Sequence, residues 1–378
     1  MKKSTFLDRI PVIAVIVLML TLVLSVRNGG GQVAKSACET MGWFPSDIGL
    51  KDHHLFFFKG YYYLVSNLVG SEDRFAYARS QDFCAWETLP TILGPSTHGL
   101  WDEMAVWAPF VYEEDEVYYL YYTGVTRKFT QSIMAATTSN PKDPTSWQAQ
   151  GMIFQPDHPG MLWEAGQWAD ARDPTVIKTG GIYYLYYTGR DISGGIIGMA
   201  TAPSPLGPWR DWGSIIPAVA SGMLESPTLA RFDGTYYLFY HHTGRGEYFR
   251  AGSSPGGPWG DPQPIRPGLA HEVWQDRTDE WFTSYLTDYS VTISPLTWDT
   301  FFSPAQPWIG DDVYHQIMPV VRLEKLNPPA LQVENSIFMW QETIGDLWDD
   351  AAGNPAADPT ADPMGDPMGQ PLGGVPYP

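Results

Sequence analysis

The chain has 378 residues, a formal net charge of −19 and an aromatic content of 14%, with 37 glycines and 33 prolines. This length suits one large domain or two modest ones. Strand formers and turn formers are both abundant, which favours an all-β fold. The acidic balance argues against nucleic acid as a partner, because nucleic-acid binding depends on clustered Lys and Arg.

The N-terminus carries a basic segment followed by an apolar run over residues 10–26. This pattern predicts that residues 1–30 are an export signal or a membrane signal-anchor, and we favour the anchor with its basic end inside. The N-terminal helix would then contact a membrane. In either case the rest of the chain is expected to be extracytoplasmic, either anchored or secreted.

Two cysteines, Cys38 and Cys84, are present. They are too few for a zinc site built on Cys alone. In an exported protein they could form one disulfide. Two unrelated buried thiols fit their spacing equally well, so the sequence leaves both readings open.

A globular domain is expected over residues 38–345, after a spacer at 27–37. The final segment, residues 349–378, is rich in Pro, Gly and Asp and poor in residues that could form a core. We therefore predict that this tail is disordered.

One unit recurs through the expected domain, and its clearest copy is ARDPTVIKTGGIYYLYYTG at residues 171–189. It contains two β-type runs joined by a glycine turn, which is typical of a hairpin. Each copy is followed by a small-residue strand end and a Trp. Periods of roughly 45 to 65 residues indicate a propeller or a solenoid. The sequence therefore predicts a five-bladed β-propeller. The five aromatic strands lie at residues 61–64, 118–122, 183–187, 236–240 and 281–285.

Aligning the copies brings functional residue types into register. One aligned position is expected to hold Asp52, Ala108, Asp173, Ser226 and His271, and Glu225 precedes Ser226. The first strand of each propeller blade lines the central channel, so these positions should converge. Three carboxylates and an imidazole are the groups that acid–base chemistry uses. A single Asp-Pro is more often structural than catalytic, and the shared register is what favours function here.

Four motifs carry a resemblance to a known family: KDHHLFFFKGYYYL, VWAPFVYEEDEVYYLYYTG, ARDPTVIKTGGIYYLYYTG and ESPTLARFDGTYYLFY. Over residues 45–300 the chain resembles glycoside hydrolase family 43. The resemblance implies cleavage of arabinofuranosyl or xylosyl linkages with inversion. It makes Asp52 the general base, Glu225 the general acid, and Asp173 the residue that raises the pKa of the acid and orients it.

The resemblance also implies that His271 matches a channel histidine, which in some members lies beside a bound calcium ion. No cofactor is otherwise expected, and the expected partner is a carbohydrate substrate. We expect His53 and His271 to contact that substrate. Trp107 is expected to serve as a stacking platform, with packing between blades as its alternative. Arg172 should point away from Asp173, because neighbours alternate on an extended strand.

The chain departs from the family at Asp52, which is followed by His53 where the family usually has Pro. Arg-Asp-Pro is also a hallmark of the fructan-cleaving families 32 and 68, which retain configuration. Their Asn-Asp-Pro and Glu-Cys motifs are absent, so a fructosidase ranks second. The alternative from another class is a non-catalytic carbohydrate-binding propeller.

Overall fold

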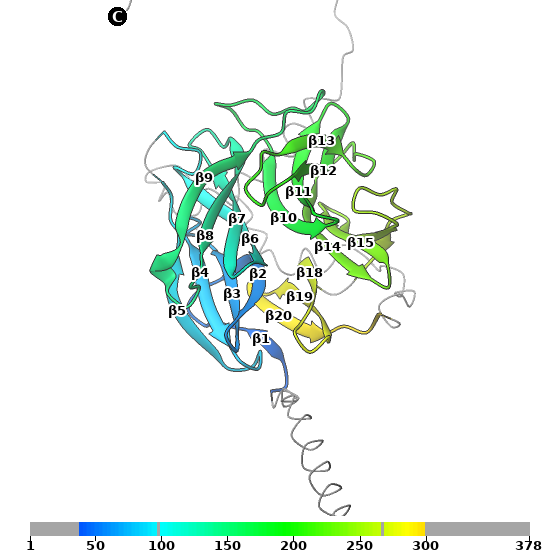
Figure 1. Ribbon diagram of the computed structural model, residues 1–378. Coiled ribbons are helices and arrows are strands. Elements are labelled where there is room, and N and C mark those ends of the chain that lie inside the picture. The colour runs from blue at the N-terminus through cyan, green and yellow to red at the C-terminus, as the bar shows by residue number, and fades with distance from the viewer. Residues whose placement is uncertain (1–37, 97–98, 266–267, 299–378) are drawn as a thin grey trace, which may run out of the picture. The chain divides into compact units, whose positions relative to one another are not determined.

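The computed structural model describes residues 38–96, 99–265 and 268–298, and these form five antiparallel sheets of four strands each. The sheets are arranged as blades around a common axis (Figure 1). The predicted all-β, five-bladed propeller is confirmed. The predicted N-terminal signal or anchor and the predicted disordered tail lie outside the described residues. Within the described ranges, no helix is long and apolar enough to cross a membrane.

Each blade is built from strands that follow one another along the chain, and four blades use consecutive strands only. Blades one and two contain, in order, β2 (Leu50–Phe58), β3 (Tyr61–Leu68), β4 (Phe75–Ser80), β5 (Trp86–Ile92), β6 (Ala105–Glu114), β7 (Val117–Val125), β8 (Gln131–Thr138) and β9 (Gln148–Phe154). A short 3₁₀ helix, η1 (Pro144–Ser146), precedes β9.

The remaining blades follow the same plan with one exception. Blades three to five contain β10 (Ala171–Thr179), β11 (Ile182–Asp191), β12 (Gly194–Ala202), β13 (Arg210–Ser214), β14 (Leu224–Phe232), β15 (Thr235–His242), β16 (Gly246–Gly252), β17 (Gln263–Pro264), β18 (Leu269–Gln275), β19 (Trp281–Thr287) and β20 (Ser290–Pro295). The exception is blade five, whose outermost strand is β1 (Met41–Trp43) from the start of the domain.

The glycine turn predicted at the centre of the repeat joins β10 to β11. Gly180 and Gly181 both have positive φ, at 59° and 79°. Two consecutive residues with positive φ are what a two-residue hairpin turn matched to the strand twist requires. The turn therefore explains why this copy of the hairpin carries two adjacent glycines.

The core is made mostly of aromatic side chains packed between blades. Tyr63, Tyr77 and Tyr122 are almost fully buried in one cluster shared by blades one and two. Burying such rings removes a large apolar area from water and rewards specific edge and offset contacts. The repeated aromatic strands of the sequence are therefore the packing surfaces between blades.

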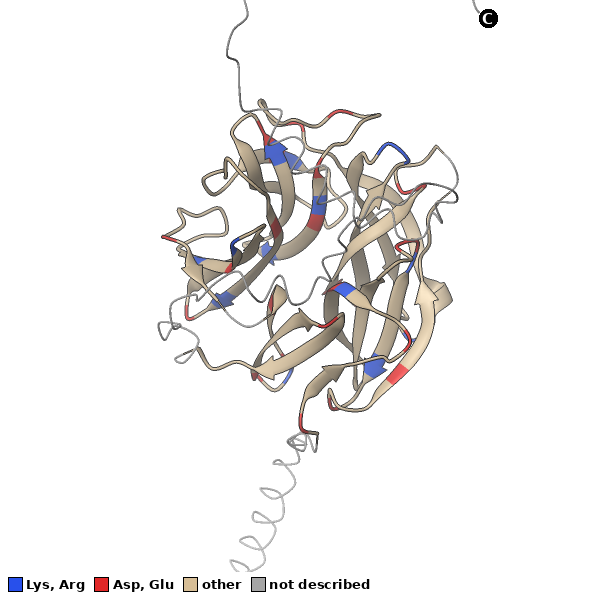
Figure 2. Cartoon of the chain, turned by 180° about the vertical axis from the view of Figure 1, so that it is seen from behind, with Lys and Arg blue, Asp and Glu red and all other residues tan. Residues whose placement is uncertain are grey.

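Charged residues are spread over the strands and loops of several blades (Figure 2). Many acidic side chains have basic partners at the surface, such as Glu87 with Arg79 and Asp73 with Arg74. Exposed pairs of this kind contribute little to stability. The surface charges are therefore consistent with solubility and point to no particular partner.

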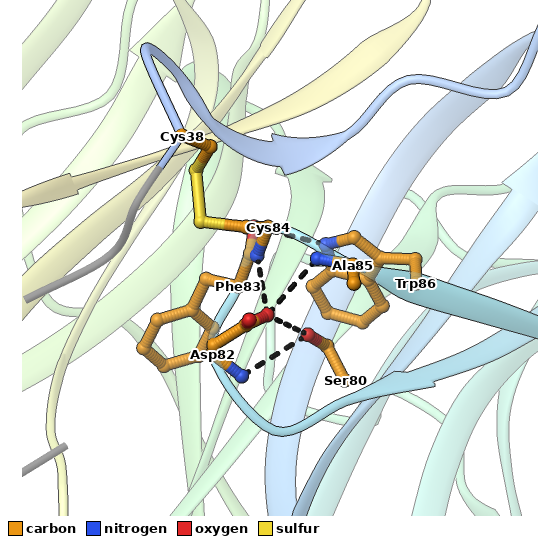
Figure 3. Close-up of a disulfide and its surroundings, with 7 residues drawn as sticks. All are labelled: Cys38, Ser80, Asp82, Phe83, Cys84, Ala85 and Trp86. Carbon is orange, nitrogen blue, oxygen red and sulfur yellow. Dashed lines mark hydrogen bonds between the residues drawn. A yellow bond between two sulfur atoms is a disulfide. The ribbon is translucent and has the colours of Figure 1, made fainter. Parts of the chain in front are cut away.

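A disulfide joins Cys38 to Cys84, so the sequence alternative of two free thiols is wrong (Figure 3). Cys84 lies in the loop between β4 and β5 of blade one, whereas Cys38 precedes β1 of blade five. Asp82 Oδ1 accepts hydrogen bonds from the backbone N–H groups of Cys84 and Ala85, both at 2.9 Å. The bond therefore ties the last blade to the first at a well-ordered loop.

The double variant Cys38→Ala/Cys84→Ala is expected to lower the free energy of unfolding by about 4 kcal/mol, because the disulfide closes a long loop in the unfolded chain. Chemical denaturation of the oxidised wild type and the variant measures the difference. A reducing agent should destabilise the wild type and leave the variant unchanged. Equal stability of oxidised and reduced wild type would contradict the prediction.

Candidate active site

Every innermost strand carries a β-bulge near its start. The register shifts in β2, β6, β10, β14 and β18. In four of these strands two residues oppose one residue of the partner strand, and in β2 Asp52 is one extra residue between two consecutive pairs. A bulge re-aims the side chains next to it. The first bulge residue has positive φ in all five blades, and the five residues are Asp52, Ala108, Asp173, Ser226 and Ala270.

The register predicted for blade five is wrong by one residue. The bulge places Ala270, not His271, at the position of Asp52 and Asp173. The turn between β18 and β19 is longer than the corresponding turns, because Gln275 pairs with Trp281 whereas Arg231 pairs with Tyr236. Counting back a fixed number of residues from the aromatic strand therefore stops one residue short in this blade.

The bulges converge on a narrow cavity of about 40 Å³ at one end of the channel. Of the predicted cluster, Asp52, Asp173 and His271 line it, whereas Glu225 is not among the lining residues. His53 lines it as well. A space of this size holds a few water molecules. The remaining lining residues come from the same bulges: Ala108, Pro109, Phe110, Pro174, Thr175, Ser226, Pro227, Thr228, Ala270 and Glu272.

Asp173 connects blade three to the backbone of blade four. Its Oδ2 accepts a hydrogen bond from Thr188 Oγ1 at 2.8 Å and another from the Ser226 N–H at 3.0 Å. Ser226 directly follows Glu225, so Asp173 holds the backbone that carries the candidate acid. This contact supports the orienting role that the sequence analysis gave to Asp173.

Glu225 lies beside this cavity, and its side chain is 24% exposed. The guanidinium of Arg172 forms a hydrogen-bonded ion pair with Glu225 Oε1. Thr243 Oγ1 donates to Glu225 Oε2 at 3.1 Å. The carboxylate therefore has a partner on each oxygen.

The prediction that Arg172 points away from Asp173 is wrong. Arg172 Nε lies 3.8 Å from Asp173 Oδ2, and the same guanidinium also binds Asp170 and Glu225. The expected alternation fails because the bulge lies between Arg172 and Thr175. Arg172 is thus part of the site, and the sequence signal that marks it is its position directly before the bulge Asp.

The family resemblance implied a raised pKa for Glu225 and an ionised Asp52, and the shifts in the structure run the other way. Burial tends to raise the pKa of Glu225, but the charges of Arg172 and His241 outweigh burial and lower it. Burial raises the pKa of Asp52 to about 7, and the nearby charge of Asp173 adds to this rise. In the sugar-free site the proton is therefore held more strongly at Asp52 than at Glu225.

Two histidines occupy the position that Pro fills in the middle blades. His53 is buried, and its Nε2 lies 2.8 Å from Ser284 Oγ. Burial lowers the pKa of His53 to about 4, so the ring is neutral. His271 is also buried, with Nδ1 3.1 Å from Thr283 Oγ1. Both line the cavity, and their contact with substrate stays a prediction.

Trp107 does not line the cavity. It is 5% exposed and packs in an apolar cluster that includes Ala105, Val125 and Phe129. The structure thus gives it the packing role that the sequence analysis offered as the alternative. Other rim aromatics form ring pairs, with Trp101 6.1 Å from Trp163.

Calcium was implied only by the family resemblance. Among the described residues, no group of three or more His, Cys, Asp or Glu side chains is arranged to hold a metal ion. Calcium beside His271 stays a prediction. No step of the proposed chemistry uses a metal.

Comparison with known families adds a direct match. The family described as "Glycosyl hydrolases family 43" matches residues 50–166, which include blades one and two. The resemblance to family 43 is confirmed. No protein with a curated description matches the chain.

Several solved structures share the fold. An α-L-arabinofuranosidase from Lactobacillus brevis aligns with a TM-score of 0.55 and 14% sequence identity. This alignment covers 71% of this chain and 98% of that enzyme. The GH43_1 enzyme from Xanthomonas citri, solved with xylose, aligns with a TM-score of 0.51 and 19% identity, and the alignment covers 71% of this chain and 96% of that enzyme. An exo-β-1,3-galactanase from Phanerochaete chrysosporium aligns with a TM-score of 0.53 and 15% identity, and the alignment covers 69% of this chain and 65% of that enzyme. At these identities the likeness supports the fold.

Asp52→Asn is expected to gain stability relative to wild type as pH rises from 3.8 to about 7. In this window the unfolded chain has lost the Asp52 proton while the folded chain keeps it, so ionisation progressively destabilises the wild type. The variant cannot ionise and escapes this cost. Urea unfolding at a series of pH values measures the difference. Glu87→Gln, at an exposed position, gives the baseline, and a flat Asp52→Asn difference would contradict the prediction.

Proposed function

We propose that the chain is a glycoside hydrolase that acts on arabinofuranosyl or xylosyl linkages, with Asp52, Asp173 and Glu225 as its working carboxyl groups. The observation that carries the proposal is that these three groups come from three blades and lie near enough for the charges of Asp173 and Glu225 to raise the pKa of Asp52. Glycoside hydrolysis needs one protonated and one ionised carboxyl at the scissile bond. The family match supports the reaction class.

In the assignment that the resemblance implies, Glu225 protonates the leaving oxygen and Asp52 activates water. Glu225 must then carry a proton in the sugar complex. Because Arg172 holds Glu225 as a carboxylate, this ion pair has to open or weaken when the sugar enters. Asp173 keeps the backbone of Glu225 in place during that change.

A reverse assignment has a specific observation in its favour. With its pKa raised to about 7, Asp52 already holds a proton at slightly acidic pH, while Glu225 is ionised. Asp52 would then protonate the leaving oxygen, and Glu225 would activate water. Both assignments use the same two carboxyls on opposite sides of the bond.

The substrate class is a pentose-containing polysaccharide or oligosaccharide. Solved structures of similar fold include arabinofuranosidase, arabinanase and galactanase enzymes. An extracytoplasmic location is also proposed, and the Cys38–Cys84 disulfide supports it because such bonds persist in oxidising compartments.

The wild type is expected to release sugar from an aryl arabinofuranoside, an aryl xyloside or arabinan. Glu225→Ala and Asp52→Ala should each lose about 10²–10⁴-fold in kcat/KM on natural linkages, because each removes an acid–base group. Glu87→Gln is the matched carboxyl control and should retain activity. Aryl galactoside and aryl fructoside test the other sugar classes. A wild type that cleaves none of these substrates contradicts the proposal and favours a binding propeller.

The two assignments predict different activities on substrates whose leaving group needs no proton. A dinitrophenyl group departs without a proton, so the variant that lacks the acid should keep most of its activity on a dinitrophenyl glycoside. We expect this selective rescue for Glu225→Ala. Rescue of Asp52→Ala instead would establish the reverse assignment. Proton NMR of the first-formed anomer then distinguishes inversion from the retention that a fructosidase-type route would give.

A further inference from the structure

Three ionisable residues form a row across blade four. Glu225 of β14 pairs directly with His241 of β15, and His241 pairs directly with Glu247 of β16. Directly paired residues of antiparallel strands project from the same face, with Cβ atoms about 4.5–5.5 Å apart. His241 therefore stands between two carboxylates on one face of the blade. The proposed mechanism uses only the first of them.

The two residues of the row on β15 and β16, His241 and Glu247, are buried and hydrogen-bonded to each other. His241 Nδ1 lies 2.8 Å from Glu247 Oε1, and the two residues are 7% and 5% exposed. The backbone N–H of Ala270, the bulge residue of blade five, donates to the same oxygen at 3.2 Å. Burial of an unpaired charge is costly, so a pair this deep indicates a cationic imidazole held by a carboxylate.

The groups that face His241 come from three strands. Burial alone would lower the pKa of His241, but the charges of Glu247, Glu225 and Asp173 outweigh burial and raise it. His241 in turn lowers the pKa of Glu225, as does Arg172 of β10. Burial tends to raise the pKa of Glu247, but His241, and to a smaller extent His271 of β18, outweigh burial and lower it.

We propose that the His241–Glu247 pair is a positioning device for Glu225, which keeps a positive charge behind this carboxyl and so sets the pH range in which the site works. This inference rests on the proposed function. Glu225 is held from two sides, by Arg172 of the neighbouring blade and by His241 of its own. If a sugar displaces Arg172, His241 remains as the fixed charge.

The chain supplies a matched control next to His241. His242 follows on the same strand, so its side chain projects to the opposite face. Its Nε2 lies 3.4 Å from the Ser221 carbonyl oxygen, and burial lowers its pKa. It is thus a histidine of similar burial without the carboxylate row.

The first measurement is an NMR titration of the histidine side chains, with His241→Asn identifying the signal. His241 should titrate above its ordinary value of 6.5. Glu225→Gln should lower its midpoint by about 1 pH unit, because an opposite charge at this range is removed. Glu247→Gln should lower it as well, while its amide oxygen still accepts from Ala270. His242 should not respond to either variant.

The second measurement is the pH profile of kcat/KM. Glu247→Gln and His241→Asn should move the limb set by Glu225 to higher pH by about 1 unit, because a nearby cation no longer favours the ionised carboxyl. This is the alkaline limb if Glu225 is the acid and the acidic limb if it is the base. His242→Gln should leave the profile in place. Melting temperatures report whether each variant is folded.

A His241 midpoint that ignores Glu225→Gln would overturn the inference, and so would variants that lose activity without any shift of the profile. Those results would leave the pair a structural role only. If the wild type has no activity on any substrate, the proposed function fails. The NMR coupling between His241 and Glu225 would still be measured in that case, so the two failures are distinguishable.

Discussion

The site depends on a β-bulge repeated at the start of all five innermost strands. A positive φ at a residue other than Gly costs on the order of 1–3 kcal/mol and persists only where the surroundings impose it. In every blade the innermost strand pairs with its one neighbour both before and after the bulge, and this pairing imposes the conformation. The bulge turns Asp52 and Asp173 toward the channel, and it brings Arg172 to the same place. Function thus follows from a distortion that ordinary strand alternation would not produce.

Burying several carboxylates in one place requires compensating charge, and the distribution of that charge decides where protons reside. Glu225 is compensated by Arg172 and His241, and it therefore ionises easily. Asp52 has less compensating positive charge, because burial is the largest influence on its pKa and raises it, and the charge of Asp173 raises it further. Two carboxyls of similar chemistry thereby acquire different proton affinities, which is what general acid–base catalysis needs. The asymmetry comes from neighbours on other strands, so motifs around each carboxyl do not reveal it.

The repeat carried most of the predictable information. Aromatic strands, the Gly180–Gly181 turn and the recurring Trp set the number of blades, because each is a local pattern with a fixed period. The register of the bulges was predictable where the period held, with Asp52 and Asp173 at equivalent positions and Glu225 directly before the bulge of blade four. It failed in blade five, where a longer turn displaced His271 by one position. Contacts between blades, such as Arg172 with Glu225, carry no local signal and needed the structure.

Ring closure is the condition under which these contacts exist, because the site is assembled from several blades. The closing contacts pair β1 with β20, and they add the disulfide and an apolar cluster that contains Trp43, Phe83 and Val291. β1 is only three residues long and pairs with three residues of β20, so this pairing alone would hold it weakly. The covalent bond to blade one removes that weakness at the single seam of the ring. The geometry around Asp52, in the blade next to the seam, therefore depends on a bond formed far from any substrate.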